Sequence, residues 1–340
     1  LPPIAQHPLE VELGRWVVDT ALTQIAAWQD AGVDLQVSVN ISGFHLQQAG
    51  FLDELRALLA AHPNVPRGYL ELEVLESSAL EDIALVSAVI DASATLGVSF
   101  ALDDFGTGYS SLTYLKRLPA QVLKIDQSFV RDMLQDSDDL AILEGILGLA
   151  TAFRRRAIAE GVETVAHGET LLRLGCDLGQ GYGIARPMAA ADLPAWRQRW
   201  RPDPRWAHAH CLDRELMPVL IAGVEHRGWI VALGEHLDGR RDAPPPLDHH
   251  QCRFGQWLDK TIHQPRHAAT FATIETLHLR VHALAADLLK RRSQGHDVEA
   301  LAGMAELHAL WDALLVHLEY LLKDDPRSLA PSSGGGSNCR

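Results

Sequence analysis

The sequence predicts a parallel α/β barrel of the TIM type, followed by a separate all-α four-helix bundle. From about residue 12 to residue 190, short apolar runs alternate with amphipathic helical segments, which is typical of parallel strands with helices packed outside them. After Pro202 the strand-like runs stop and long stretches of helical periodicity follow. A chain of 340 residues has room for both domains.

Seven apolar runs are the candidate strands, and near-continuous apolar character is expected for strands that a barrel buries on both faces. A doubly wound sheet is the structural alternative, but no glycine fingerprint of the dinucleotide type follows the first run. The runs are residues 35–41, 69–75, 98–103, 121–126, 156–162, 176–181 and 182–187.

The second domain is predicted from four helical segments, the pattern of a four-helix bundle. The stretch RWRPDPRW is interpreted as a linker, and the low-complexity end PSSGGGSNCR as a disordered tail. The helices are expected at 212–238, 253–262, 266–292 and 298–323, and the domains at 1–198 (barrel), 199–210 (linker), 211–325 (bundle) and 326–340 (tail).

Composition narrows the classes of partner. The chain is 47% hydrophobic and 22% charged with a net charge of −14, which argues against a nucleic-acid polymer and suits cation binding in carboxylate-rich pockets. The four cysteines are too widely spaced to suggest a disulfide framework, so we expect a reducing, cytoplasmic location. No apolar run reaches membrane-spanning length and no signal peptide is visible, so no membrane segment is expected in this chain.

Polar side chains stand at the ends of six of the candidate strands, and the carboxyl ends of barrel strands converge on one rim. So many carboxylates would repel one another unless cations bound between them, and oxygen ligands without histidine or cysteine favour Mg²⁺ or Mn²⁺. Two such metals, about 3.5–4 Å apart, would clamp a phosphodiester and activate a water. Asp103 would bridge them and Asp104 would bind only one. The polar residues are Asn40, Glu73, Glu76, Asp103, Asp104, Lys124, Asp126, Glu160, Glu163 and Gln180.

The stretch ALDDFGTGYSSL admits two other interpretations. Asp104-Phe105-Gly106 spells the metal-binding tripeptide of protein kinases, but no glycine-rich loop precedes a lysine-bearing strand and no His-Arg-Asp loop lies upstream. Each polar residue taken alone is equally well a helix cap or a turn residue. Six strand ends with this composition make that explanation improbable for the whole set.

The motifs VNIS, LELEVLES, DDFGTGYSSL, LKID, AEGVET and QGYGIARP resemble those of EAL-domain cyclic di-GMP phosphodiesterases, over roughly residues 1–195. The resemblance implies a barrel enzyme that opens cyclic di-GMP (c-di-GMP) to linear pGpG. It also implies two Mg²⁺ or Mn²⁺ ions, one held by Asn40, Glu73 and Asp103 and the other by Asp103, Asp104 and Glu160.

The same resemblance implies further roles. Lys124 would orient the attacking water, with Asp126 holding the lysine, and Glu160 is a candidate base. Gln180 would lie near water or substrate. Glu76 and Glu163 would fix the loop that runs from Asp104 through Tyr109 and Ser110 and shapes a homodimer.

Two departures from the family pattern stand out. Leu75 replaces a common threonine, which we take as neutral. The family's Glu-Ala-Leu strand, with a metal-binding glutamate and a nearby phosphate-binding arginine, is not found, and LPPIAQ resembles the segment after it. We therefore expect seven of eight barrel strands, and a 340-residue chain that binds its catalytic metals weakly and turns over slowly. A metal-free c-di-GMP sensor or signalling adaptor is the non-enzymatic alternative.

Thirteen of the 17 histidines lie between His208 and His317, which helix packing alone does not require. His278 and His282 are four residues apart and share a helix face, and together with His226 and Cys252 they make a tetrahedral set for one Zn²⁺. Four protein ligands indicate a closed site for sensing or structure. His249 and His250 lie near Cys252 as competing ligands, and His308 and His317 are interpreted as core residues.

The segments HRGW, CRFGQW and HLRVH resemble the chemoreceptor zinc-binding (CZB) domain over about residues 208–323. Trp229, Phe254 and Trp257 would be its packing residues, and Gly255 would allow close approach of helices. The resemblance implies a dimer. Zinc binding, or oxidation of the Cys252 thiolate, would repack the bundle and act on the barrel through the 200–210 linker. A purely structural zinc is the alternative.

Overall fold

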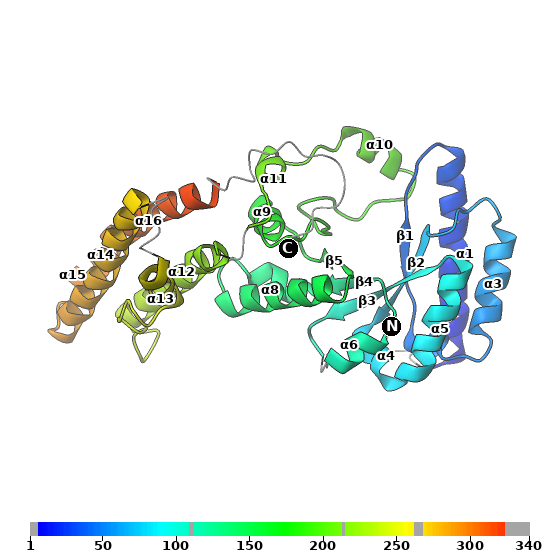
Figure 1. The fold of residues 1–340 in the computed structure, drawn as a ribbon, viewed down its shortest axis with the longest axis horizontal. Coiled ribbons are helices and arrows are strands. Elements are labelled where there is room, and N and C mark those ends of the chain that lie inside the picture. Colours follow the sequence, from blue (N-terminus) through cyan, green and yellow to red (C-terminus); the bar gives the residue numbers. More distant parts are fainter. Residues whose placement is uncertain (1–5, 109–111, 213–214, 262–267, 324–340) are drawn as a thin grey trace. The chain divides into compact units, whose positions relative to one another are not determined.

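The structure is a computed structural model that describes residues 6–108, 112–212, 215–261 and 268–323 (Figure 1). The chain divides into two compact units. The barrel unit comprises residues 1–131, 142–168 and 176–204, and the helical unit comprises residues 132–141, 169–175 and 205–340.

The barrel unit is built on one parallel sheet whose strands follow one another in chain order. A doubly wound sheet would instead reverse its strand order at a switch point, so the predicted TIM-like class is confirmed and the alternative is excluded. The strands are β1 (Val37–Asn40), β2 (Leu70–Leu75), β3 (Ser99–Phe105), β4 (Val122–Ile125) and β5 (Arg156–Ala159).

Two of the seven predicted strands are wrong. Residues 176–181 contribute only an isolated bridge between Gly179 and Ala159, and residues 182–187 form no strand. Glycine explains the irregular path: a β-carbon at Gly181 would lie 2.4 Å from the backbone nitrogen of Val162, so this segment packs backbone against backbone.

Helices connect the strands, and their ends follow local sequence signals. In α5, for example, Asp82 accepts a hydrogen bond from the backbone N–H of Leu85 (3.0 Å), and Gly97 ends the helix at φ +88°. The helices before the bundle are α1 (Pro8–Asp30), α2 (Gly43–Leu46), α3 (Phe51–Ala61), α4 (Glu76–Glu81), α5 (Ile83–Leu96), α6 (Leu112–Arg117), α7 (Gln127–Asp132), α8 (Ser137–Ala152), α9 (Val165–Arg173), α10 (Leu193–Arg199) and α11 (Pro204–His208).

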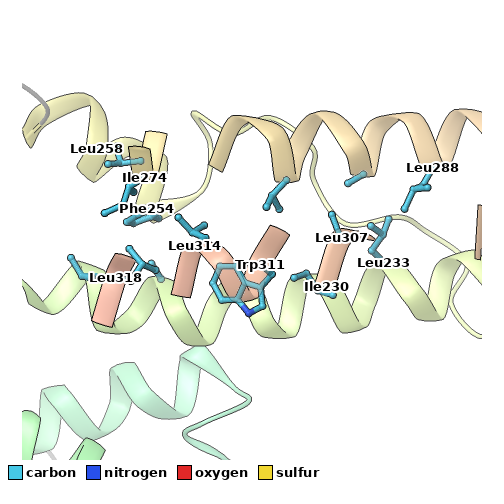
Figure 2. Packing of buried hydrophobic residues seen from close by; sticks show 14 of the residues in the cluster. Ile230, Leu233, Phe254, Leu258, Ile274, Leu288, Leu307, Trp311, Leu314 and Leu318 are labelled. Atoms are coloured by element: carbon cyan, nitrogen blue, oxygen red, sulfur yellow. The ribbon is translucent and has the colours of Figure 1, made fainter. Parts of the chain in front are cut away.

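The helical unit has the predicted all-α architecture, and side chains such as Leu233, Leu307 and Leu314 form its core (Figure 2). The helix expected at 298–323 is divided at Gly303, where a β-carbon would lie 2.2 Å from the Leu288 side chain. Among the described residues, no helix combines the length and the apolar character needed to cross a membrane. The helices are α12 (Met217–Leu237), α13 (Arg253–Thr261), α14 (Ala268–Ser293), α15 (Asp297–Ala302) and α16 (Met304–Lys323).

Candidate metal centres

A bulge in β3 brings the two adjacent aspartates to the same site. The register between β3 and β4 shifts between Leu102 and Phe105, and Asp104 has φ +53°. In a regular strand consecutive side chains point to opposite faces, so Asp103 and Asp104 could not share a ligand position. The bulge removes that restriction: carboxylate oxygens of Asp103, Asp104 and Glu160 all lie within 4.8 Å of one another.

Lys124 is a buried cation among the carboxylates at the carboxyl ends of the strands, which form the rim of the barrel. Its ammonium lies 2.7 Å from carboxylate oxygens of Glu73, Asp103 and Glu160. Burial alone would lower the pKa of Lys124, but its hydrogen bonds to Asp103, Glu160 and Glu73 outweigh that effect and raise the pKa above its ordinary value. Lys124 therefore stays charged and offsets part of the negative charge of the rim.

Charge at the rim is only partly compensated. Desolvation raises the pKa of Asp104, and the neighbouring carboxylates of Asp103 and Asp126 raise it further. Desolvation also raises the pKa of Glu73, although Lys124 counteracts it. A divalent cation among Asp103, Asp104 and Glu160 would relieve this repulsion, so the donor set fits Mg²⁺ or Mn²⁺.

Asp126 was predicted to hold Lys124, and no direct bond between these two side chains is found in the described part of the chain. Strand β4 ends at Ile125, so Asp126 lies beyond the strand, and its carboxylate accepts hydrogen bonds from the backbone N–H (2.9 Å) and the hydroxyl of Ser128. It therefore stabilises the first turn of α7 and places a negative charge beside Asp104.

Asn40 lies at the end of a strand, as expected, whereas Gln180 lies in residues 176–181, which contribute only an isolated bridge. Asn40 ends β1 opposite Glu73, and its side chain is exposed. Gln180 is also exposed, and its backbone N–H donates to the carbonyl of Ala159 (2.8 Å). The Glu73 carboxylate, opposite Asn40, is engaged by Lys124.

The loop after β3 is attached to Glu76, whose buried carboxylate accepts a hydrogen bond from the backbone N–H of Gly106 (3.0 Å). A β-carbon at Gly108 would lie 2.7 Å from the same carboxylate. Glu163 is exposed, and no hydrogen bond joins its carboxylate to the described part of this loop. Tyr109 and Ser110, predicted to extend the loop to a dimer partner, lie outside the described residues.

In the helical unit, all four predicted zinc ligands come together. His226 on α12, Cys252 just before α13, and His278 and His282 on α14 offer ligand atoms within 4.8 Å of one another. The rings of His278 and His282 are 4.7 Å apart, as their spacing of one helical turn predicts. Three imidazoles and one thiol form a donor set that suits tetrahedral Zn²⁺.

The orientation of the imidazoles supports metal binding. His226 Nδ1 lies 3.1 Å from the carbonyl of Ala222, and His282 Nδ1 lies 2.9 Å from the carbonyl of Leu247. Each Nδ1 is therefore assigned the proton, which leaves the Nε2 lone pair for the cluster. His282 Nε2 is buried without a hydrogen-bond partner, and His226 Nε2 faces His278 Nε2 at 3.1 Å. A zinc ion would bind the lone pairs of these Nε2 atoms.

Burial keeps the imidazoles neutral, the form that binds metal. Desolvation lowers the pKa of His226 to about 4, and that of His278 to about 2, with further lowering by neighbouring histidines. Desolvation also lowers the pKa of His282 and raises that of Cys252. Zinc itself would stabilise the thiolate of Cys252.

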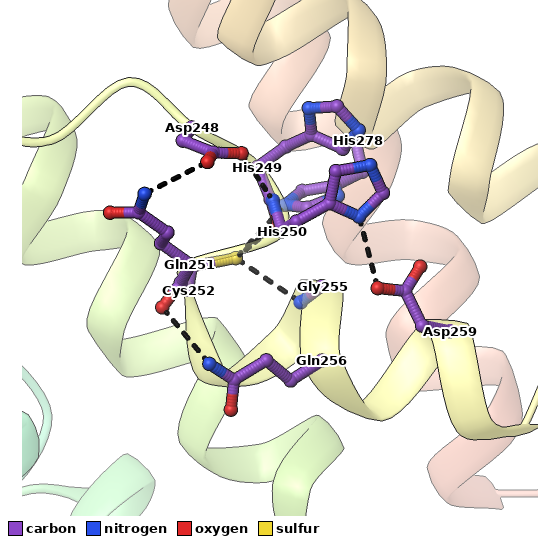
Figure 3. A network of polar contacts seen from close by, with 9 residues as sticks. All are labelled: Asp248, His249, His250, Gln251, Cys252, Gly255, Gln256, Asp259 and His278. Atoms are coloured by element: carbon purple, nitrogen blue, oxygen red, sulfur yellow. Dashed lines mark hydrogen bonds and ion pairs between the residues drawn. The ribbon is translucent and has the colours of Figure 1, made fainter.

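Gly255 allows close approach at this site, but the approaching element is a loop and not a helix. A β-carbon at Gly255 would lie 1.7 Å from the carbonyl oxygen of His249. The Gly255 backbone N–H also donates to Cys252 Sγ (3.1 Å), which fixes the sulfur (Figure 3). A cavity of about 350 Å³ borders His226, Cys252 and His282.

Aromatic rings surround the cluster. Phe254 is fully buried, meets His278 edge-on at 5.1 Å and stacks on Trp257. Trp229 lies 4.9 Å from His282. Trp311, which was not among the predicted packing residues, stacks its indole on His226 at 5.4 Å.

The carbonyls of Ala222 and Leu247 were also missed, because backbone acceptors leave no signature in a sequence. His308, expected in the core, is exposed and bonded to the carbonyl of Met304.

Two family models match the chain: the EAL domain over residues 1–187 and the chemoreceptor zinc-binding domain over residues 226–289. The first match spans more than half of the chain, so the chain belongs to the EAL domain family. The predicted resemblance is thereby confirmed, with a CZB region following the EAL domain.

Named relatives agree with this assignment. The bifunctional diguanylate cyclase/cyclic di-GMP phosphodiesterase MucR of Pseudomonas aeruginosa is 43% identical over 196 residues, which cover 57% of this chain and 28% of that protein. The cyclic di-GMP phosphodiesterase PdeR of Escherichia coli is 37% identical over 192 residues, covering 56% and 29%. The chain thus spans less than a third of the length of these two curated relatives.

Solved structures show the same fold. A structure described as PaMucR phosphodiesterase in complex with c-di-GMP matches with a TM-score of 0.54 and 42% identity, covering 56% of this chain and 78% of that chain. The EAL domain of Mycobacterium smegmatis DcpA matches with a TM-score of 0.53 and 36% identity, covering 56% and 86%.

Proposed function

We propose that the barrel unit hydrolyses c-di-GMP to linear pGpG and that the helical unit regulates this reaction through zinc. The observation that carries the first part is the β3 bulge, which directs Asp103 and Asp104 toward Glu160. The relatives named as cyclic di-GMP phosphodiesterases support the choice of substrate.

Different residues would bind the metals and compensate the charge during hydrolysis. Asp103, Asp104 and Glu160 would hold a divalent metal, and Asn40 and Glu73 would help to hold a second. When bound, the metals would polarise the phosphodiester and activate a water. Lys124 would offset the charge that develops on the phosphate oxygens, because its ammonium stays protonated at the centre of the rim.

The attacking water needs a base. Glu160 would accept its proton on a carboxylate oxygen, and the ion pair of that carboxylate with Lys124 would fix its position. Gln180 would contact substrate or water from the adjacent segment, where backbone pairing with Ala159 positions it.

Turnover of c-di-GMP with Mg²⁺ or Mn²⁺ tests this proposal. Asp104→Asn should keep the bulge but lower the rate by more than the roughly 10–100-fold that loss of an outer-shell partner costs a metal site. Asp136→Asn, an exposed acidic position outside the rim, is the control. Binding of c-di-GMP without turnover by the unsubstituted protein would favour the alternative role as a receptor or adaptor.

Zinc regulation is the second part of the proposal. Binding would join α12, the start of α13 and α14 at one ion, and would satisfy the buried nitrogen of His282. We expect this repacking to reach the barrel through the linker at 199–210 and to involve a homodimer. Low zinc concentrations should change the phosphodiesterase rate, and His226→Ala should abolish the change. If zinc left the phosphodiesterase rate unchanged, the proposed regulation would be refuted and the zinc site would be purely structural.

A further inference from the structure

We propose that His249 is a reserve ligand of the zinc site, whose imidazole takes the fourth coordination position when the Cys252 thiolate leaves the metal. This inference rests on the zinc site proposed above. It follows from the position of one loop, which carries both His249 and Cys252 next to His278 (Figure 3). The His249 ring also lies beside that of His282.

The His249 ring already lies beside the ligands. Its centroid is 6.2 Å from that of His278 and 6.2 Å from that of His282. The rings of the predicted imidazole ligands lie 4.7 Å (His278 and His282), 5.1 Å (His226 and His278) and 5.7 Å (His226 and His282) apart. His249 is therefore only slightly farther from its neighbours than the ligands are from one another.

The backbone of this loop is held in place by the site itself. The carbonyl of Leu247 accepts from His282 Nδ1 (2.9 Å), and the carbonyl of Pro246 accepts from the Trp229 indole (2.7 Å). On the other side of His249, its carbonyl contacts the first turn of α13 at Gly255. Side-chain rotation of His249 would then suffice to reach the metal, without a new loop conformation.

His249 and His250, which the sequence leaves as equal competitors, differ in the structure. His250 Nδ1 is paired with Asp259 Oδ2 at 2.9 Å, and its backbone N–H donates to Asp248. For His249, no hydrogen bond to a ring nitrogen is found within the described part of the chain. His249 thus keeps its nitrogen lone pair available, whereas His250 is directed toward Asp259.

The exchange has a clear chemical trigger. The cavity of about 350 Å³ beside Cys252 gives small electrophiles access to the sulfur. With an alkyl halide such as iodoacetamide, the sulfur forms a carbon–sulfur bond, iodide leaves, and a neutral thioether remains. Zinc binds a thioether poorly, and a fourth imidazole would replace it. The site would keep its ion, while its net charge would change from +1 to +2.

Zinc affinity measured by chelator competition on the full chain tests the exchange. The variants are Cys252→Ala, His249→Ala and the double variant, with His250→Ala in the Cys252→Ala background as the matched control. We expect Cys252→Ala to retain zinc, and removal of His249 from that background to weaken binding by at least roughly 10–100-fold. His249→Ala alone and the His250 control should each change affinity by less than about 3-fold.

Cobalt substitution gives a second readout that does not depend on enzymatic activity. Co²⁺ in the unsubstituted protein should show a sulfur-to-cobalt charge-transfer band. Cys252→Ala should lose that band but keep the intense visible bands of tetrahedral cobalt, and the double variant should lose both. Wild-type protein alkylated at Cys252, verified by mass spectrometry, should show the same cobalt bands as Cys252→Ala. Because this protein folds before it is alkylated, the test does not depend on the folding of a variant.

Three results would overturn the exchange. The first is that neither Cys252→Ala nor the alkylated protein binds zinc, and the second is that adding His249→Ala to Cys252→Ala leaves the zinc affinity unchanged. The third is that His249→Ala lowers the zinc affinity equally in the unsubstituted protein and in Cys252→Ala. Absence of zinc binding by the unsubstituted protein would instead refute the zinc site itself. The two failures are therefore distinguishable.

Discussion

The two candidate metal sites of this chain balance their buried polar groups in opposite ways. At the barrel rim, negative carboxylates surround the Lys124 ammonium, so part of the charge is balanced by the protein itself. In the helical unit the imidazoles are neutral, and His282 Nε2 is buried without a partner. The carboxylates at the rim are thus held in place by Lys124 before a metal binds. In the helical site, the buried His282 Nε2 would gain a partner only when a metal binds.

The largest effect is expected from removal of the rim's own cation. Lys124→Met would leave Glu73, Asp103 and Glu160 buried or half-buried without it, and breaking a buried ion pair costs about 3–5 kcal/mol. The free energy of unfolding, measured by urea denaturation, should fall by this amount, and excess Mg²⁺ should restore part of it. Exposed Lys116 provides the control as Lys116→Met. An undiminished stability of Lys124→Met would mean that the rim does not rely on this cation.

Zinc should dominate the stability of the helical unit. A ligand present at 100 times its Kd stabilises the state that binds it by about 2.7 kcal/mol. Adding a chelator should therefore lower the thermal unfolding midpoint of the unsubstituted protein, and readdition of zinc should reverse this. His226→Ala should lack the response, while His296→Ala, an exposed position, should retain it. Equal midpoints with and without zinc would contradict the contrast between the two sites.

Gly255 tests how tightly the loop must lie on α13. Gly255→Ala would place a methyl group 1.7 Å from the His249 carbonyl, and overpacking of this kind costs about 1–3 kcal/mol. The variant should also bind zinc more weakly, because the Cys252 sulfur accepts from the Gly255 N–H. At Gly145, in α8, a β-carbon meets no neighbouring atom within 4 Å, so Gly145→Ala should leave both zinc affinity and stability intact.

The last expected effect is a pH dependence of the stability of the zinc-free protein. His226 has a pKa of about 4 when folded and 6.5 ordinarily, so between these pH values the unfolded chain binds more protons and acid favours unfolding. Stability should be fully present above about pH 6.5 and should fall toward pH 4, by at most about 1.4 kcal/mol per pH unit for each such histidine. Urea midpoints at several pH values measure the slope.

His226→Gln should flatten this slope, whereas His296→Gln, which changes an exposed histidine, should not. A slope of equal size in His226→Gln would show that other groups cause the acid sensitivity.

The sequence by itself determined the donor types, the order of most elements and the two domain families. Near-continuous apolar runs located five strands, period-3.6 patterns located the helices, and the spacing of His278 and His282 placed both on one helix face. These properties are local, because they depend on neighbouring residues along the chain.

Only the tertiary structure decided how those donors are used. The β3 bulge that brings Asp104 beside Asp103 depends on pairing with β4, and the three partners of Lys124 come from three other segments. The same holds for the backbone carbonyl of Leu247, which orients His282, and for the close backbone contacts of the glycines within residues 176–187. Such contacts join residues distant in the chain, so no local pattern encodes them.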